Sequence, residues 1–335
     1  MFQSVIVFMR GPMLCPRIRR RTGGPAGRTA APTAACRGPA HSAAWKDPSR
    51  SFADADGGPM ADSREHVLTG TRCSVTAREW PLDRPRYVAL LAHGHGEHIG
   101  RYAYVADVLR GHGAAVFGPD HMGHGRSAGE RVLIEDVEDV VTDLRAVDAL
   151  ARAAHPGAPV VLVGHSMGGL VAARFAQRYG DSLAGLVLSA PVVGGPEPLR
   201  RLLALDPLPD VPIDPSALSR DPSVGRDYAR DPLVWHGPFK RPTLEAFTHA
   251  LETVAGHGDV GALPLLWMHG DDDRVVPLSA TRAGIEDLRG TEWTERLYAG
   301  ARHELFNETN KDAVLGDVTA FVDRVLPARP SQTEA

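Results

Sequence analysis

Cysteine is scarce in this sequence, with three residues among 335, at positions 15, 36 and 73. Spacing this wide gives no disulfide framework and favours a reducing compartment, so we expect a cytoplasmic protein. The sequence also has no apolar run that approaches the ~18 residues needed to cross a bilayer. Strong charge is lacking too, because the formal net charge is −4. That balance gives no reason to expect nucleic acid as a partner.

Residues 1–60 differ in composition from the rest of the chain. They hold nine Lys or Arg but only three Asp, and they are rich in Arg, Pro, Gly and Ala. Their apolar run from Val5 to Met9 is shorter than a signal-peptide core, although an Arg-rich, acid-poor start also resembles an organellar transit peptide. We expect an extension that cannot fold alone. It is either a disordered tail or the product of a start codon assigned ahead of Met60.

Residues 61–330 have the pattern of one folded domain, with a disordered tail at 331–335. Continuous apolar segments alternate with amphipathic ones, which predicts a mostly parallel sheet with helices on both faces. At about 194–261 Pro and Asp accumulate, and we interpret this stretch as an insertion. The predicted strands are 65–68, 71–76, 87–92, 114–117, 159–163, 183–188, 264–269 and 293–298, beginning with a hairpin. The predicted helices are 102–110, 137–153, 170–179, 280–288 and 314–326, with 199–203 and 244–254 in the insertion.

The most informative motif is the Gly-x-Ser-x-Gly stretch from Gly164 to Gly168, with Ser166 at its centre. A predicted strand precedes it and a predicted helix follows, which is the context of a nucleophile elbow. Glycines on either side of the serine let the backbone bend sharply, because a Cβ at those positions would clash. The motif by itself is weak, so the strand–turn–helix context carries the prediction that Ser166 is a nucleophile.

A serine hydrolase also needs an acid and a base, which in α/β-hydrolases follow the serine in that order. Asp271, Asp272 and Asp273 come after one predicted strand, and His303 comes after the last one. Both positions lie at carboxyl ends of strands, where open parallel sheets bind ligands. Chain order therefore predicts His303 as the general base and one of the three aspartates as its partner, without choosing among them.

Two backbone amides are the next requirement, because attack on an ester places negative charge on the carbonyl oxygen. Met167, the residue after the nucleophile, is expected to supply one N–H. The loop after the strand 87–92 is expected to supply the other. Its sequence is HGHGEH, and within it His95 is the expected donor.

The same loop also permits a metal interpretation. HGHGEH resembles the His-x-His-x-Asp-His signature of metallo-β-lactamase-fold hydrolases, in which histidines and an aspartate hold two zinc ions. Two features oppose this interpretation: Glu97 stands where that family has Asp, and a long helix rather than a strand follows the second motif. We therefore expect no metal. The histidines that the interpretation would use are His93, His95, His98, His165 and His303.

Taken together, the motifs of residues 67–326 resemble the monoacylglycerol lipases of the serine α/β-hydrolase superfamily, in particular the actinobacterial type. In chain order they are HGHGEHIGRY from His93, DHMGHGRSAGER from Asp120, GHSMGG from Gly164, SRDPSVGRDYARDPL from Ser219, HGDDDR from His269 and YAGARHELFNE from Tyr298. The resemblance implies an α/β-hydrolase fold with an inserted cap at about 194–261.

The matched motifs also imply roles for individual residues. Ser166, His303 and Asp273 match the catalytic triad, which selects one of the three aspartates. His95 and Met167 match the two oxyanion donors. For the Glu97 and Arg101 side chains the alternative to substrate binding is an ion pair that only holds the HGHGEH loop in place. The residues matched to substrate binding are Glu97, Arg101, Tyr102 and Tyr228, with His98 expected beside them.

The sequence departs from the family pattern in two places. His95 occupies a position that usually bears a smaller or apolar side chain, and the cap between Pro196 and Ile213 is shorter than in the animal enzymes. The leucines of this short cap either form an apolar rim for acyl chains or a membrane surface, or pack inside the cap. They are Leu199, Leu202, Leu203 and Leu205.

The expected function is therefore hydrolysis of monoacylglycerols to fatty acid and glycerol through an acyl-enzyme, without a metal or organic cofactor. The partner is a lipid ester, with peripheral membrane contact through the cap. A broader carboxylesterase or lysophospholipase would use the same triad. A non-catalytic binding protein on the same scaffold is disfavoured because all three triad residues are present.

Overall fold

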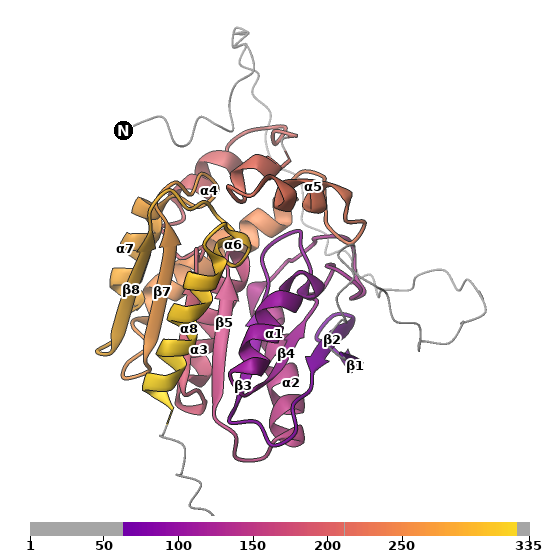
Figure 1. Ribbon diagram of the computed structural model, residues 1–335. Helices are drawn as coiled ribbons and strands as arrows, with labels where there is room; N and C mark the ends of the chain where they lie inside the picture. The colour runs from indigo at the N-terminus through magenta and orange to yellow at the C-terminus, as the bar shows by residue number, and fades with distance from the viewer. Residues whose placement is uncertain (1–62, 211, 327–335) are drawn as a thin grey trace, which may run out of the picture. The chain divides into compact units, whose positions relative to one another are not determined.

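The structure is a computed structural model that describes residues 63–210 and 212–326 (Figure 1). The predicted extension at 1–60, the start at Met60 and the tail at 331–335 lie outside these residues. At the centre of the described part is an eight-stranded sheet in the order β1-β2-β4-β3-β5-β6-β7-β8. Its strands are β1 Arg64–Thr69, β2 Ser74–Trp80, β3 Tyr87–Ala92, β4 Ala114–Pro119, β5 Val160–His165, β6 Gly185–Ser189, β7 Leu265–Gly270 and β8 Trp293–Tyr298.

The sheet is mostly parallel, as the sequence predicts. β1 and β2 form the expected antiparallel hairpin, and β2 is also antiparallel to β4. Every other neighbouring pair, from β4 through β3 to β8, is parallel. All residues of β3 to β7 are buried, which explains why these strands are continuously apolar rather than alternating.

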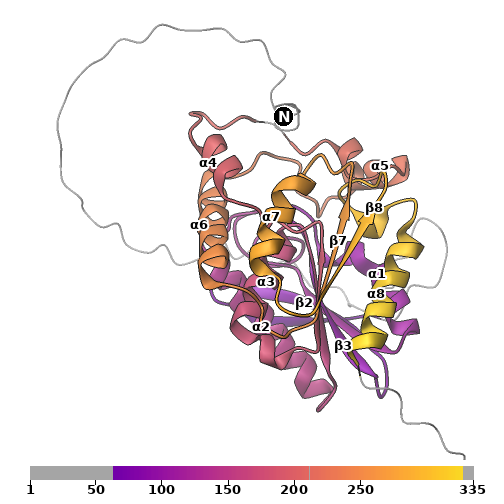
Figure 2. The same ribbon diagram turned by 90° about the vertical axis from the view of Figure 1, so that its left-hand side faces the viewer.

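Helices cover both faces of the sheet, and alternate residues of each central strand point into different cores. In β3, Val88 and Leu90 belong to the core beneath α2, α3, α6 and α7, whereas Ala89 and Leu91 belong to the core beneath α1 and α8. Figure 2 shows the sheet between these two layers. The helices are α1 Ala103–Gly111, α2 Val137–Ala154, α3 Met167–Tyr179, α6 Arg241–His257, α7 Leu278–Leu288 and α8 Lys311–Val325.

Four predicted elements are wrong by three or more residues at one end or both. The helices expected at 244–254 and 314–326 run from Arg241 to His257 and from Lys311 to Val325. The second strand is expected at 71–76 but runs from Ser74 to Trp80, because Gly70 N–H donates to Cys73 O in a tight turn that occupies those first residues. The helix expected from Leu170 begins at Met167. Gly168 and Gly169 look like turn residues in the sequence, yet here they form the first turn of α3.

The segment between β6 and β7 contains α4 (Glu197–Leu203), α5 (Pro222–Arg230) and α6. α6 packs into the larger core, whereas α4 has no fully buried residue. Figure 1 shows α4 and α5 at the upper end of the molecule. The four leucines expected to form either an apolar rim or a packed cap core are all half-buried, so neither arrangement describes them fully. They are Leu199, Leu202, Leu203 and Leu205.

None of the helices within residues 63–210 and 212–326 combines the length and the apolar composition that crossing a bilayer requires.

Candidate active site

Ser166 stands at a sharp turn between β5 and α3. Its backbone has φ +54° and ψ −118°, a conformation that is strained for a residue with a side chain. The turn depends on close backbone approach at both flanking glycines. A Cβ on Gly164 would lie 2.3 Å from Gly168 O, and one on Gly168 would lie 2.1 Å from Ala92 O. The predicted elbow is therefore present, with Ser166 Oγ at the carboxyl end of the sheet.

His303 lies between Ser166 and Asp273. Its Nδ1 is 2.8 Å from Asp273 Oδ2, and its Nε2 is 2.9 Å from Ser166 Oγ. Because a carboxylate can only accept, Nδ1 carries the proton and Nε2 accepts from the serine hydroxyl. All three residues are at most 9% exposed, so the chain of hydrogen bonds is shielded from water.

Electrostatics raise the proton affinity of His303 and keep its partner Asp273 ionised. Burial lowers the pKa of His303, but the charge of Asp273 and the hydrogen bond to it outweigh burial and raise that pKa above the ordinary histidine value. Burial raises the pKa of Asp273, yet the charge of His303 and hydrogen bonds from His269 and His303 bring it well below its ordinary range. Asp273 therefore stays ionised.

The other two aspartates of this turn have different partners. Asp272 pairs with Arg274 at 2.9 Å, and Asp271 accepts from the Gly300 N–H at 2.6 Å. Asp273 is also held by its other oxygen, which accepts from the N–H groups of Val275 and Val276 at 2.8 and 2.9 Å. Of the three, the structure brings Asp273 alone against His303.

The HGHGEH loop lies beside the nucleophile. A Cβ built on Gly94 would be 3.3 Å from Ser166 Cβ, and the Gly94 N–H donates to Glu97 Oε1 at 2.6 Å. Met167 is the first residue of α3, so its N–H has no acceptor within the helix. Within the described residues no hydrogen bond occupies the His95 N–H either. Neither expected oxyanion donor is bound to another group among the described residues.

The imidazole of His95 is packed among aromatic rings. It stacks on Phe239 at 4.5 Å between ring centroids, with an angle of 13° between the planes, and meets Phe247 and His124 edge-on. Neither ring nitrogen has a hydrogen-bond partner among the described residues. Burial and the neighbouring His124 lower the pKa of His95 well below the ordinary value, so the ring is neutral.

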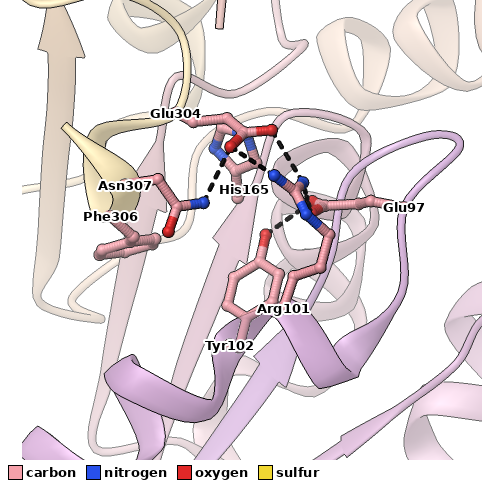
Figure 3. Close-up of a pocket in the computed structure, with 7 residues that line it drawn as sticks. All are labelled: Glu97, Arg101, Tyr102, His165, Glu304, Phe306 and Asn307. Carbon is pink, nitrogen blue, oxygen red and sulfur yellow. Dashed lines mark hydrogen bonds and ion pairs between the residues drawn. The ribbon is translucent and has the colours of Figure 1, made fainter. Parts of the chain in front are cut away.

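On the other side of the loop, a buried polar cluster surrounds Arg101 (Figure 3). Its guanidinium binds Glu97 at 2.6 Å and both oxygens of Glu304 at 2.8 Å. The Tyr102 hydroxyl donates to Glu97 Oε1 at 2.8 Å. Burial raises the pKa of Glu304, but Arg101 more than compensates and lowers it to about 2. A cavity is lined by this cluster together with His165, Phe306 and Asn307.

Tyr228 of α5 reaches the same region from above. The Arg101 guanidinium lies 5.3 Å from the centre of its ring, and a Cβ built on Gly96 would be 4.0 Å from its hydroxyl. Burial, with a further contribution from Glu304, raises the pKa of Tyr228 to about 12, so its hydroxyl keeps its proton. The structure therefore brings Glu97, Arg101, Tyr102 and Tyr228 together, as expected.

Comparison with known proteins agrees with this arrangement. Residues 83–310 match the family model described as serine aminopeptidase, S33. A monoacylglycerol lipase of Mycolicibacterium smegmatis is 36% identical over 269 residues, 77% of this chain and 96% of that protein. A monoglyceride lipase of Mus musculus is 32% identical over 277 residues, 78% of this chain and 91% of that protein. The chain belongs to the monoacylglycerol lipase family.

Solved structures agree with this family and its α/β-hydrolase fold. The crystal structure of Paleococcus ferrophilus monoacylglycerol lipase superimposes with a TM-score of 0.64 at 26% identity, over 75% of this chain and 99% of that one. The predicted α/β-hydrolase fold is confirmed.

Three of the histidines that a zinc site would use form hydrogen bonds with other groups in this member of the lipase family. His93 Nδ1 donates to Gly94 O, His165 Nδ1 donates to Ser189 O, and His98 Nε2 pairs with Asp231 at 2.8 Å. Among residues 63–210 and 212–326, no group of three or more His, Cys, Asp or Glu is arranged to hold a metal ion. The side chain of His98, which we expect to belong with Glu97, Arg101 and Tyr102, pairs with Asp231.

Several residues of the site have no assigned role in the sequence-based prediction. Glu304 directly follows His303 in the quoted motif, and its neighbours gave no sign that it would reach Arg101. His269 is the penultimate residue of β7 and has its Nε2 3.3 Å from Asp273 Oδ2. Asp231 belongs to the quoted motif from Ser219, but only the fold brings it to His98.

Proposed function

We propose that this protein hydrolyses the ester bond of monoacylglycerols through an acyl-enzyme on Ser166. The observation that carries the proposal is the buried chain from Ser166 Oγ through His303 to Asp273, with hydrogen bonds of 2.9 and 2.8 Å. This is the arrangement of nucleophile, base and orienting acid that acyl transfer requires. Kinship with lipases of monoacylglycerols supports the choice of ester.

The first half of the reaction forms the acyl-enzyme. Ser166 Oγ attacks the ester carbonyl carbon while His303 Nε2 takes the hydroxyl proton, and ionised Asp273 stabilises the resulting imidazolium. The N–H groups of His95 and Met167 hold the negative oxygen of the tetrahedral intermediate. The bond between the carbonyl carbon and the glycerol oxygen then breaks, and His303 gives its proton to the departing oxygen.

The second half releases the fatty acid. A water molecule attacks the acyl carbonyl carbon and gives a proton to His303 Nε2, forming a second tetrahedral intermediate at the same two N–H groups. The bond to Ser166 Oγ breaks, and the proton returns from His303 to the serine. No step of this sequence calls for a cofactor.

An amphiphilic substrate fits the contrast between the two sides of the oxyanion loop. On one side the Tyr228 hydroxyl lies near Gly96 and supplies a polar group that suits the glycerol hydroxyls, while the buried ion pair of Arg101 with Glu97 supports the loop. Phe239 and Phe247 lie against His95 on the other side, which suits the acyl chain. We assign lipid contact to α4, whose half-buried leucines can exchange cap contacts for lipid.

The test is fatty-acid release by the full chain from mono-, di- and triacylglycerols, a lysophospholipid and an amino-acid amide. Preference for the monoacylglycerol by tenfold or more in kcat/KM supports the proposal, with Ser166→Ala as the inactive control. Equal activity on all esters would reduce the function to a general esterase. Turnover of the amide alone, or turnover retained by Ser166→Ala, would contradict the proposal.

A further inference from the structure

Glu308 is a buried carboxylate outside the proposed catalytic residues. It follows the short 3-10 turn Leu305–Asn307, and its side chain is fully shielded from solvent. Oε1 accepts from the backbone N–H groups of Arg220 at 3.0 Å and Arg302 at 2.9 Å. Oε2 accepts from Arg220 Nε and the Thr309 N–H, both at 2.9 Å. Both oxygens are thus fully used.

The partners of Glu308 come from two distant parts of the chain. Arg302 immediately precedes His303, whereas Arg220 belongs to residues 214–235, which we call the strap. Burial raises the pKa of Glu308, but the hydrogen bonds from Arg302, Arg220 and Thr309 lower it below the ordinary value. The carboxylate therefore stays charged and accepts these bonds, together with a longer one from the Thr309 hydroxyl at 3.4 Å.

His303 is fixed through the residues on both of its sides. The Arg302 N–H donates to Glu308 Oε1, and the Glu304 N–H donates to Leu218 O of the strap at 2.8 Å. The Arg302 guanidinium adds bonds to the carbonyl oxygens of Ser216 at 2.6 Å and Ser219 at 2.9 Å. The histidine backbone can shift only if these bonds loosen.

The same strap also holds the oxyanion loop. The Trp235 N–H donates to Gly96 O at 2.7 Å, and Asp231 pairs with His98 at 2.8 Å. One segment therefore connects the loop that carries the base with the loop that carries an oxyanion donor.

We propose that Glu308 is a positioning residue for the general base, clamping the backbone before His303 to the strap so that the imidazole stays between Asp273 and Ser166. This inference rests on the proposed function, since it concerns the alignment of that reaction. Loosening the clamp moves the imidazole relative to both partners. Small misplacements of reacting groups cost a large part of the rate, and a weaker bond to Asp273 also brings His303 nearer to its ordinary proton affinity.

The experiment compares Glu308→Gln with wild type in the full chain, measuring kcat and KM for a monoacylglycerol from pH 5 to 9 together with thermal unfolding. The glutamine amide has nearly the same volume as the glutamate side chain, but its N–H₂ group faces N–H donors that need an acceptor. We expect kcat to fall about tenfold to a hundredfold with KM changed less than threefold. The acidic limb of the kcat/KM profile should move to lower pH, because the bond that raises the His303 proton affinity is weakened.

Asp148→Asn is the matched control. Asp148 is equally buried and pairs with Arg145 and Arg152, but it lies on α2, away from the site. This variant should lose thermal stability while its kcat and acidic limb stay unchanged. Equal losses of kcat in both variants would overturn the proposal, as would a Glu308→Gln enzyme with kcat within twofold of wild type or an unmoved acidic limb.

Arg220→Ala covers the case in which Glu308→Gln does not fold. Arg220 is partly exposed, and truncation removes its bonds to Glu308 Oε2, Asn310 and Ala299 O while the Arg220 N–H remains. It should give the same two changes at smaller size, with kcat lowered threefold or more; normal kcat and pH profile would overturn the proposal. Wild-type hydrolysis, measured in parallel, tests the proposed function separately, because its absence would contradict that function before any variant is compared.

Discussion

Two parts of the segment between β6 and β7, the strap and the stretch that contains α4, are held in place in different ways. The strap forms hydrogen bonds and ion pairs with the loops around His303 and His95, most of them through backbone groups. The stretch that contains α4 is attached mainly to α6, through Arg241 bonds to Leu203 O and Leu205 O and an ion pair between Arg200 and Glu252.

This difference assigns alignment of the catalytic loops to the strap and contact with lipid to α4. Directional bonds to backbone groups fix distances and angles, which suits a segment that touches both proposed catalytic loops. Half-buried leucines on a short helix make non-directional contacts that a lipid can replace at little cost. We therefore expect changes in the strap and its loops to alter kcat, and changes in α4 to alter the response to lipid surfaces.

The largest expected effect lies beside the loop that the strap holds, at the acid that binds His303. Asp273→Asn should lower kcat by about four orders of magnitude, because the amide no longer holds His303 with the proton on Nδ1. Asp272→Asn is the matched control on the same turn, since Asp272 pairs with Arg274 at 2.9 Å, lies 3.8 Å from Arg302 Nε and does not reach His303. Its kcat should remain within twofold of wild type. Steady-state kinetics of the two variants decide the point, and similar losses in both would contradict our assignment of the acid.

The next effect is the dependence of activity on pH. Since Asp273 raises the pKa of His303 above about 6.5, the base becomes protonated as pH falls through that raised value. kcat/KM should then fall about tenfold per pH unit on the acidic side and stay level above the limb. Asp273 remains ionised throughout, so it adds no second limb above pH 5. A limb centred at or below pH 6 would contradict the assigned interaction.

A smaller effect is expected where the strap meets the oxyanion loop. His98→Ala and Asp231→Ala should each lower kcat about tenfold by releasing the loop that carries the His95 N–H. Because the two side chains bind each other, the double variant should lose little more than either single one. A double-mutant cycle measures this coupling, which for contacting residues is about 0.5–3 kcal/mol. Strictly additive losses would show that the pair does not act as a unit.

The smallest effect is expected in α4. Leu202→Ser combined with Leu203→Ser should leave kcat/KM for a dissolved short-chain ester within twofold of wild type. The rate on monoacylglycerol in vesicles or micelles should fall several-fold, because less apolar surface meets the lipid. Glu252→Gln, which breaks the ion pair with Arg200, serves as a control that changes no leucine. Equal losses on both kinds of substrate would assign these leucines to cap packing instead.

Much of the fold could be predicted because the central strands are buried on both faces. β3 and β8 have the predicted bounds, and the other parallel strands differ from prediction by at most two residues at either end. Prediction was poorer where glycine allows two conformations. The Gly-x-Ser-x-Gly pattern predicts a turn that includes Gly168, but packing of α3 against β3 and β5 makes this residue helical.

The site divides in the same manner. Ser166 and His303 follow from strand–turn–helix context and chain order, which are local or sequential properties. The contacts of Glu304 with Arg101, and of Asp231 with His98, join residues more than a hundred positions apart. Nothing in the local pattern distinguishes such residues from solvent-exposed charges, so their partners could not be predicted.

By itself, the sequence determined the alternation of strands and helices, the elbow around Ser166 and the order of acid and base. These depend on side-chain periodicity and on what each backbone position tolerates, which neighbouring residues settle. Chain order left three aspartates open as the partner of His303, and the resemblance to the family pointed to Asp273, which the structure places against the base. Only the tertiary structure decided where His98 finds its partner and how Glu308 joins the strap to the base. Those contacts exist because parallel strands bring their carboxyl-end loops together, so that buried charges from distant parts of the chain satisfy one another.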